Sequence, residues 1–305
     1  MTVPGASLPQ PTVAFATPRR LPKPQSVPGR VVVLDIAFAA DGTGASFEKV
    51  TGVFLKGLGD RLAAWVDHHD HAFHSRYRDD PRFVLATKAQ HGACPEMVTP
   101  DLVARTGPVD SIVCHADLDG LYSAAKWLRG GVEPYPGADD DARAVDTRLG
   151  DPSALGTLID HALRVRGRDE DFLSRVVRFL SDGAADPGQR DDIALAGAPF
   201  TAVAARTRAL ADERYTLHGS VAVCDVTDVP PRDYDKTDLL LLGQRRGTVA
   251  VVYDSQNVTL AAPFDSGVDF LSMLGVSGGM PTVLSVPRAR LDEALRALSA
   301  RGLYR

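Results

Sequence analysis

Short apolar runs alternate with segments of helical spacing along most of the chain. The run VVVLDIAF at 31–38 is rich in β-branched residues and leads into a glycine-containing loop at 41–44, which is typical of a buried parallel strand. Further strands are predicted at 63–66, 83–86 and 111–115, and helices at 46–62, 95–105 and 121–130. This alternation predicts an α/β fold in which helices cover both faces of a mostly parallel sheet.

The pattern of hydrophobic and polar residues changes twice in the second half of the chain. Residues 151–213 have helical spacing, with a Gly/Asp/Pro-rich interruption at 182–192 that we interpret as a linker or hinge. From 219 on, strands and helices alternate again. We therefore predict an N-terminal domain at 29–190, a helical linker that continues to about 215, and a smaller C-terminal α/β domain at 216–305.

Composition narrows the class of protein. The 305 residues are 44% hydrophobic and 24% charged, which excludes a mostly disordered or membrane-spanning chain. Seven prolines in residues 1–28 predict an extended or disordered arm without a secretory signal, so we expect a cytoplasmic protein. The net charge of −5 argues against a coat on duplex DNA or a membrane partner. Three cysteines are too few for a disulfide framework.

Histidines are concentrated in one short segment. Of the eight in the chain, five fall between positions 68 and 91, and a sixth is His115. Asp67, His68 and His69 directly follow a predicted strand, and two imidazoles beside a carboxylate are suitable ligands for Mn, Fe or Zn. The alternative is a solvated histidine-rich turn without a ligand.

A second motif, HADLDG at 115–120, follows another predicted strand. His115, Asp117 and Asp119 occupy alternate positions, which places their side chains on one side of an extended segment. One of these acids can instead cap the next helix. Capping needs a single acid, however, and two acids beside a histidine favour a bound cation.

Both motifs fall at predicted strand ends, as do two further aspartates. Asp35 ends the first buried strand, and Asp146 is predicted to follow a strand in AVDTR. Because ligands bind at the carboxyl ends of parallel strands, we expect these groups to converge at one edge of the sheet.

Together, WVDHHDH after an Asp-terminated strand and the H-x-D-x-D-G pattern resemble the DHH phosphoesterase superfamily, over most of residues 30–290. That group contains RecJ-type exonucleases, oligoribonucleases, phosphoadenosine-phosphate phosphatases and cyclic-dinucleotide phosphodiesterases. The resemblance implies two divalent ions, preferably Mn, with Mg or Co as alternatives. The metal ligands that it implies are Asp35, Asp67, His68, His115, Asp117, Asp119 and Asp146.

The same resemblance assigns roles to other residues. His69 is expected to orient a ligand or touch phosphate, Asp67 to brace its neighbours and His91 to contact the scissile phosphate. The loop GVSGGMP at 275–281 is similar to the glycine-rich loop of the accessory domain called DHHA1. The substrate-binding residues expected in the C-terminal domain are Ser277, Gly278, Gly279, Arg245 and Arg246.

Two features depart from the superfamily. Its members carry H-x-D-x-D-G before DHH, whereas here DHH comes first, which indicates a circular permutation or a segment swap. Met280 stands where a phosphate-contacting histidine is usual, and a thioether cannot replace an imidazole there.

The resemblance predicts a metal-dependent phosphoesterase that hydrolyses a small nucleotide or a short single-stranded oligonucleotide with a metal-activated water. The alternatives are a catalytically weak nucleotide- or protein-binding relative with a structural metal, and a phosphoanhydride hydrolase. The sequence leaves the oligomeric state, including a homodimer, open.

Overall fold

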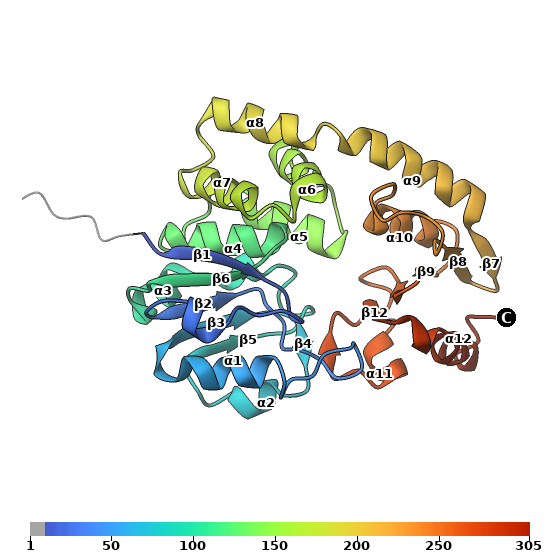
Figure 1. Cartoon of the computed structure of the whole chain (residues 1–305), viewed down its shortest axis with the longest axis horizontal. Helices are drawn as coiled ribbons and strands as arrows, with labels where there is room; N and C mark the ends of the chain where they lie inside the picture. Colours follow the sequence, from blue (N-terminus) through green and yellow to red (C-terminus); the bar gives the residue numbers. More distant parts are fainter. Residues whose placement is uncertain (1–9) are drawn as a thin grey trace, which may run out of the picture.

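The computed structural model describes residues 10–305, which form two α/β units with a set of helices beside the first (Figure 1). The first unit contains a five-stranded sheet in the order β1-β6-β2-β3-β5 in which every neighbouring pair is parallel. Its strands are β1 (Thr12–Ala16), β2 (Val31–Leu34), β3 (Leu62–Asp67), β5 (Phe83–Leu85) and β6 (Ser111–His115). The predicted parallel α/β fold is confirmed.

Helices cover both faces of this sheet, which is why β2 is apolar at all four positions. Val31 and Val33 pack on the side of α1 (Thr51–Leu58), whereas Val32 and Leu34 pack on the side of α4 (Leu118–Leu128). Successive strand residues point to opposite faces, so a strand covered on both sides has no polar position. Further short helices of this unit are α2 (His74–Tyr77) and α3 (Pro100–Thr106).

The first strand of the sheet lies in the segment predicted to be an extended or disordered arm. Thr12–Ala16 forms the edge strand β1 and pairs in parallel with β6. Thr12, Val13 and Phe15 supply β-branched and aromatic side chains that suit a half-buried edge strand. The prediction of an arm therefore fails from Thr12, and residues 1–9 lie outside the described part of the chain.

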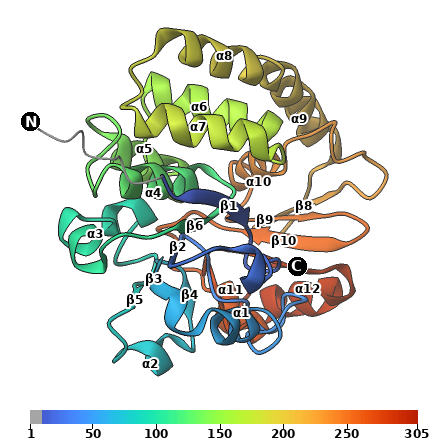
Figure 2. The same cartoon turned by 60° about the vertical axis from the view of Figure 1, so that its left-hand side comes forward.

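Helices α5 to α9 follow the first sheet, with bounds Ala138–Thr147, Ala154–Arg166, Glu170–Ser181, Pro187–Gly197 and Phe200–Arg214. Both views place α6, α7 and α8 beyond α4, on the same side of the sheet (Figure 1, Figure 2). The predicted linker at 182–192 is shorter than expected because Asp186 caps α8 and Pro187 begins it. Ile193 of α8 belongs to the first apolar core and Ala211 of α9 to a core of the second unit.

The second unit contains a mixed sheet in the order β12-β10-β9-β8-β7, in which only β8 and β9 are parallel. Its strands are β7 (Thr216–His218), β8 (Val221–Asp225), β9 (Val249–Tyr253), β10 (Asn257–Ala261) and β12 (Val283–Pro287), and its helices are α10 (Lys236–Gln244), α11 (Phe270–Leu274) and α12 (Leu291–Ala300).

A short β-ladder joins the two units. β4 (Asp70–His71) of the first unit pairs antiparallel with β11 (Gly278–Gly279) of the second. A Cβ atom on Gly278 would lie 2.2 Å from Cδ2 of His71, so the close approach requires glycine. Throughout residues 10–305, the helices are too short or too polar to cross a bilayer.

Candidate metal centre

Acidic and histidine side chains converge where three central strands of the first sheet end. β2 leads into Asp35, β3 ends at Asp67 and leads into His68, and β6 ends at His115. Asp35 adopts a φ of 56°, a conformation that non-glycine residues rarely take. Local strain of this kind concentrates at functional sites, where the surrounding structure holds it in place.

The side chains form three overlapping groups in which the ligand atoms lie within 4.8 Å of one another. These groups are Asp35 with His68 and His69, Asp35 with His115 and Asp117, and His68 with Asp119 and Asp146. Six of the seven ligands expected from the sequence are therefore brought together. The seventh, Asp67, sits behind His69, with its Oδ1 2.8 Å from Nδ1 of the ring.

The donor set is suitable for a divalent cation. Asp35 Oδ1, Asp67 Oδ2 and His115 Nδ1 are buried and form no well-aligned hydrogen bond within residues 10–305, although Asp35 Oδ1 lies 3.2 Å from His68 Nε2 and His115 Nδ1 lies 2.6 Å from Asp117 Oδ2. Buried polar atoms are normally satisfied, so a cluster of unsatisfied ones requires an explanation. All three are carboxylate oxygens or an imidazole nitrogen, which are ligands for Mn, Fe or Zn. We interpret the part of the cluster around Asp35 and His115 as a metal site.

Asp117 combines the two roles that the sequence left open. Its Oδ1 accepts from the Gly120 amide at 3.0 Å and so caps α4, while Oδ2 lies 2.6 Å from Nδ1 of His115. A Cβ on Gly120 would come within 2.3 Å of the His115 carbonyl oxygen, so only glycine lets the chain turn from β6 into the helix. Capping and metal binding are thus compatible here.

The buried carboxylates differ in their electrostatics. Burial raises the pKa of Asp119 to about 8, with a further contribution from the negative charge of Asp35. Both Asp119 oxygens accept from the Cys94 amide, at 3.0 and 3.1 Å. Burial also acts to raise the pKa of Asp35, but His115 and His68 outweigh it and hold that pKa well below its usual range. Asp35 is therefore the more firmly ionised of the two.

His68 is oriented by the main chain. Its Nδ1 lies 2.9 Å from the His91 carbonyl oxygen, which can only accept, so Nδ1 carries a proton. Nε2 faces Asp35 and Asp119, 3.2 and 3.0 Å away, and although burial acts to lower the pKa of His68, these carboxylates outweigh it and raise that pKa to about 11. An outer hydrogen bond that fixes the tautomer is characteristic of metal-binding histidines.

The side chain of Lys88, a residue that the sequence patterns did not indicate, also reaches the cluster beside His68. Its side chain is 3% exposed, and Nζ lies 2.8 Å from His68 Nε2 and pairs with the Asp146 carboxylate. Burial acts to lower the pKa of Lys88, but Asp146, Asp119 and Asp35 outweigh it and raise that pKa above its usual value. An ammonium ion therefore sits among these carboxylates.

Asp146 reaches the cluster from a different element than predicted. It was expected at the end of a strand, but it lies in the last turn of α5. A carboxylate is unfavourable at a helix C-terminus because of the helix dipole, and the ion pair with Lys88 offsets that effect. The prediction of its element was wrong, although its proximity to His68 and Asp119 agrees with the sequence analysis.

Two other predicted catalytic histidines differ in their surroundings. Asp67 accepts from Nδ1 of His69, which leaves Nε2 of that ring as the acceptor, and the side chain is 17% exposed. The ring of His91 is 41% exposed and faces Glu96 at 3.2 Å, so its clearest contribution to the cluster is the carbonyl that orients His68.

The glycine-rich loop of the second unit is bound to the first. The Ser277 hydroxyl accepts from the Asp41 amide at 2.8 Å, and its carbonyl accepts from the Ala72 amide at 2.8 Å. Gly278 and Gly279 form β11, so this loop joins the two units. Of the two predicted arginines, Arg246 pairs with Asp212 and the Leu242 carbonyl, and Arg245 belongs to the end of α10.

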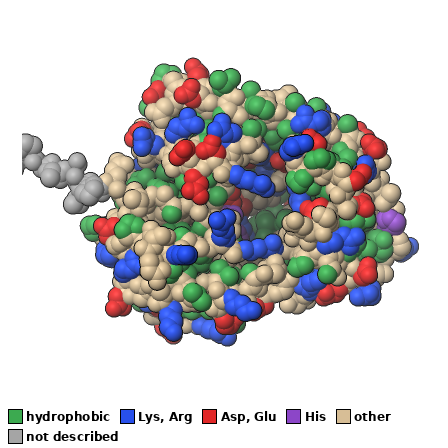
Figure 3. All heavy atoms as spheres, in the orientation of Figure 1, with side chains coloured by type: hydrophobic (Ala, Val, Ile, Leu, Met, Phe, Trp, Pro, Cys, Tyr) green, Lys and Arg blue, Asp and Glu red, His purple; other side chains and the backbone are tan. Residues whose placement is uncertain are grey.

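Two adjoining cavities of about 260 and 270 Å³ lie beside the cluster, and both are lined by Asp146, Arg148 and Thr237. The first also contains Asp117, Asp119 and Arg164, and the second has an apolar wall that includes Phe264 and Met280. Figure 3 shows Lys and Arg side chains around a hollow in the middle of one face.

Arg148 is a candidate binding residue that the sequence analysis missed. Arg164 is neutralised by Asp160, Asp235 and Asp238. In contrast, no partner for the guanidinium of Arg148 is found in the part of the chain that the structure describes. Arg148 has a φ of 62°, and it directly follows the predicted AVDT segment. The sequence signal that could have identified Arg148 was its position at the end of the AVDTR motif.

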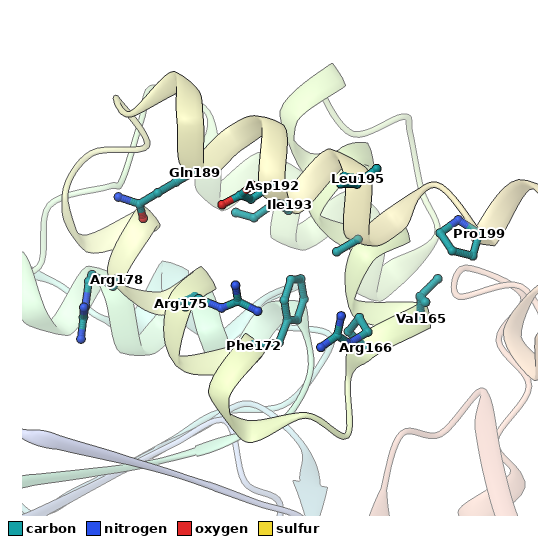
Figure 4. Close-up of a pocket in the computed structure, with 11 residues that line it drawn as sticks. Val165, Arg166, Phe172, Arg175, Arg178, Gln189, Asp192, Ile193, Leu195 and Pro199 are labelled. Atoms are coloured by element: carbon teal, nitrogen blue, oxygen red, sulfur yellow. The ribbon is translucent and has the colours of Figure 1, made fainter.

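A larger cavity, of about 550 Å³, lies elsewhere, between α6, α7 and α8 (Figure 4). Phe172 projects into it between Arg166 and Arg175, whose guanidinium carbons lie 5.4 and 5.6 Å from the ring centroid. None of the clustered histidines or aspartates lines this cavity, so its size does not identify the functional site.

The fold and the cluster define an α/β protein with a buried Asp/His site that is able to hold a metal ion. Neither a family model nor a curated protein matches the sequence. Among solved structures, the chain is similar to the pGpG-specific phosphodiesterase PggH from Vibrio cholerae, with a TM-score of 0.35 and 12% identity. The match covers 52% of this chain and 64% of that one, less than two thirds of its length.

Proposed function

We propose that this protein is a metal-dependent phosphoesterase of the DHH type that hydrolyses a small nucleotide or a short single-stranded oligonucleotide. The proposal is carried by one observation: three overlapping groups of Asp and His ligand atoms, each within 4.8 Å, lie at the carboxyl edge of a parallel sheet. A divalent ion held there lowers the pKa of a bound water to about 7 and neutralises charge on phosphoryl oxygens. Asp35, His115 and Asp117 are the residues that would hold it.

The chain's own groups supply binding and orientation. Arg148 provides an unpaired guanidinium beside Asp146 for a phosphate group, because arginine binds phosphate through paired N–H donors. Asp67 holds the proton of His69 on Nδ1, so the other ring nitrogen is available to accept a proton or a hydrogen bond.

The adjoining cavity suits a nucleoside. Its wall contains Phe264, Pro263 and Leu240, and apolar and aromatic surfaces of this kind bind bases by stacking. Each cavity alone, at about 260 and 270 Å³, is close to the lower end of the usual range for small-ligand sites, roughly 300–1,000 Å³, and the two together fall within it. This size favours a mononucleotide or a dinucleotide over a long strand.

The experiment is a substrate panel with the full chain. It contains pAp, pApA, a five-nucleotide RNA, cyclic dinucleotides and pyrophosphate, each with Mn, Mg, Co, Zn or chelator. We expect metal-dependent release of phosphate or nucleotide from one phosphoester class, lost in Asp117→Ala and retained in Asp140→Ala, an exposed aspartate outside the cluster. Absence of turnover on every member, with metal bound, would contradict the proposal.

A second candidate is a nucleotide-binding protein without turnover. It is favoured by Lys88, because an ammonium ion occupies part of the cluster where a catalytic metal would otherwise bind. In that case the same panel would show nucleotide affinity without product.

A further inference from the structure

The Asp35 end and the Asp146 end of the cluster differ in how their negative charge is compensated. At one end, the carboxylates of Asp35 and Asp117 face histidine rings, and no lysine or arginine of residues 10–305 forms an ion pair with them. At the other end, Asp119 accepts from the Cys94 amide, and the Asp146 carboxylate is paired with the buried ammonium group of Lys88. The side chain that makes this difference is Lys88.

The Lys88 ammonium group contacts two of the three ligands that this end of the cluster offers to a cation. His68 Nε2, an Asp119 oxygen and an Asp146 oxygen lie within 4.8 Å of one another, a spacing that allows one ion to bind all three. The Lys88 ammonium contacts Nε2 at 2.8 Å and pairs with Asp146. Since the ammonium group lies in contact with Nε2 and with the Asp146 carboxylate, a metal ion cannot bind these two groups while Lys88 is in this position.

The surroundings of Lys88 hold it there. Its side chain is 3% exposed, and the carboxylates nearby provide the counter-charge that a buried ammonium group requires. The amide of Lys88 also donates to Asp70, which fixes the chain next to β4. Both the side chain and the backbone of Lys88 are therefore held in place at the site.

We propose that the Lys88 ammonium takes the place of a second divalent ion, so that the cluster binds a single metal, held by Asp35, His115 and Asp117. This inference rests on the metal site of the proposed function but does not depend on the substrate. It differs from the two-ion expectation drawn from the sequence, because the second set of ligands already has a positive charge from the protein.

The test is the stoichiometry of Mn²⁺ in the full chain, measured by elemental analysis after desalting and by calorimetric titration. We expect one ion per chain in the wild type and two in Lys88→Ala, in which the second ion produces the EPR signal of a coupled manganese pair. Lys126→Met is the matched control, because Lys126 is also buried and paired with an aspartate, Asp139, outside the cluster. It should bind one ion.

Two ions in the wild type, or none, would overturn the inference, and this result does not depend on how the variants fold. One ion in a Lys88→Ala protein that unfolds as cooperatively as the wild type would also overturn it. Because no substrate is present, a chain that binds one Mn²⁺ but hydrolyses nothing would contradict the proposed function and leave this inference standing.

Discussion

The Asp35 end and the Asp146 end of the cluster contain the same kinds of side chain, yet they differ in how their charge is compensated. The carboxylate of Asp35 pairs with histidines, whereas that of Asp146 is paired with a buried lysine. The comparison teaches that a set of metal-type ligands defines where a cation binds, but not which cation. A neighbouring ammonium group can meet the same electrostatic requirement as a divalent ion.

The largest effect is expected from Asp35→Asn. Asp35 belongs to two of the three ligand groups, and its carboxylate is in contact with both His68 and His115. A metal ion contributes several kcal/mol to transition-state stabilisation, so its loss should lower kcat/KM by about 10³-fold or more. Steady-state kinetics and Mn²⁺ binding, with Asp140→Asn as the control, check this expectation. Retention of one tightly bound ion would refute the assignment of Asp35.

A comparison of Asp146→Asn with Asp117→Asn distinguishes the roles of the two ends of the cluster. Removing the Asp146 charge leaves Lys88 buried without its main counter-ion and should lower the free energy of unfolding by about 3 kcal/mol. Asparagine caps a helix as well as aspartate does, so Asp117→Asn should change stability by less than about 0.5 kcal/mol. Mn²⁺ affinity should change in the opposite order, with a loss of about 100-fold for Asp117→Asn and little change for Asp146→Asn.

Urea unfolding of the metal-free proteins measures the first quantity, and titration with Mn²⁺ measures the second. Equal effects of the two substitutions on both quantities would mean that the ends of the cluster are equivalent, contrary to the distinction drawn above.

The smallest effect is expected from Arg148→Ala. If this arginine binds a substrate phosphate, its loss removes a charged hydrogen bond worth about 1.5 kcal/mol, which raises KM about tenfold. Both metal stoichiometry and stability should stay the same, because Arg148 has no side-chain partner within residues 10–305. Arg214→Ala, which removes an exposed arginine of α9 paired with Asp228, is the control. A fall in kcat at unchanged KM would contradict a role in binding.

Local sequence patterns predicted the strands and the edge at which the site lies. Three buried strands end in Asp35, in Asp67 and in His115, and parallel strands place their carboxyl ends at one edge whatever their order in the chain. For the same reason, the H-x-D-x-D-G motif and the DHH motif meet even though DHH comes first here.

The structural features that the sequence did not predict depend on contacts between distant segments. β1 is a strand because it pairs with β6, about 100 residues further along, and its proline-rich surroundings conceal that partner. The glycine-rich loop forms a ladder with β4 because Gly278 admits the ring of His71, which no local pattern indicates.

The residue types and their spacing along the strands determined a cation-binding edge in an α/β protein, because strand periodicity and parallel pairing are local rules. The balance of charge at that edge depended on the tertiary structure. Lys88 follows a short strand in an ordinary polar loop, and Asp146 ends a helix 58 residues later. Only folding places the two in contact at the cluster, because the Coulomb energy that pairs them depends on their distance in space and not on their separation in the chain.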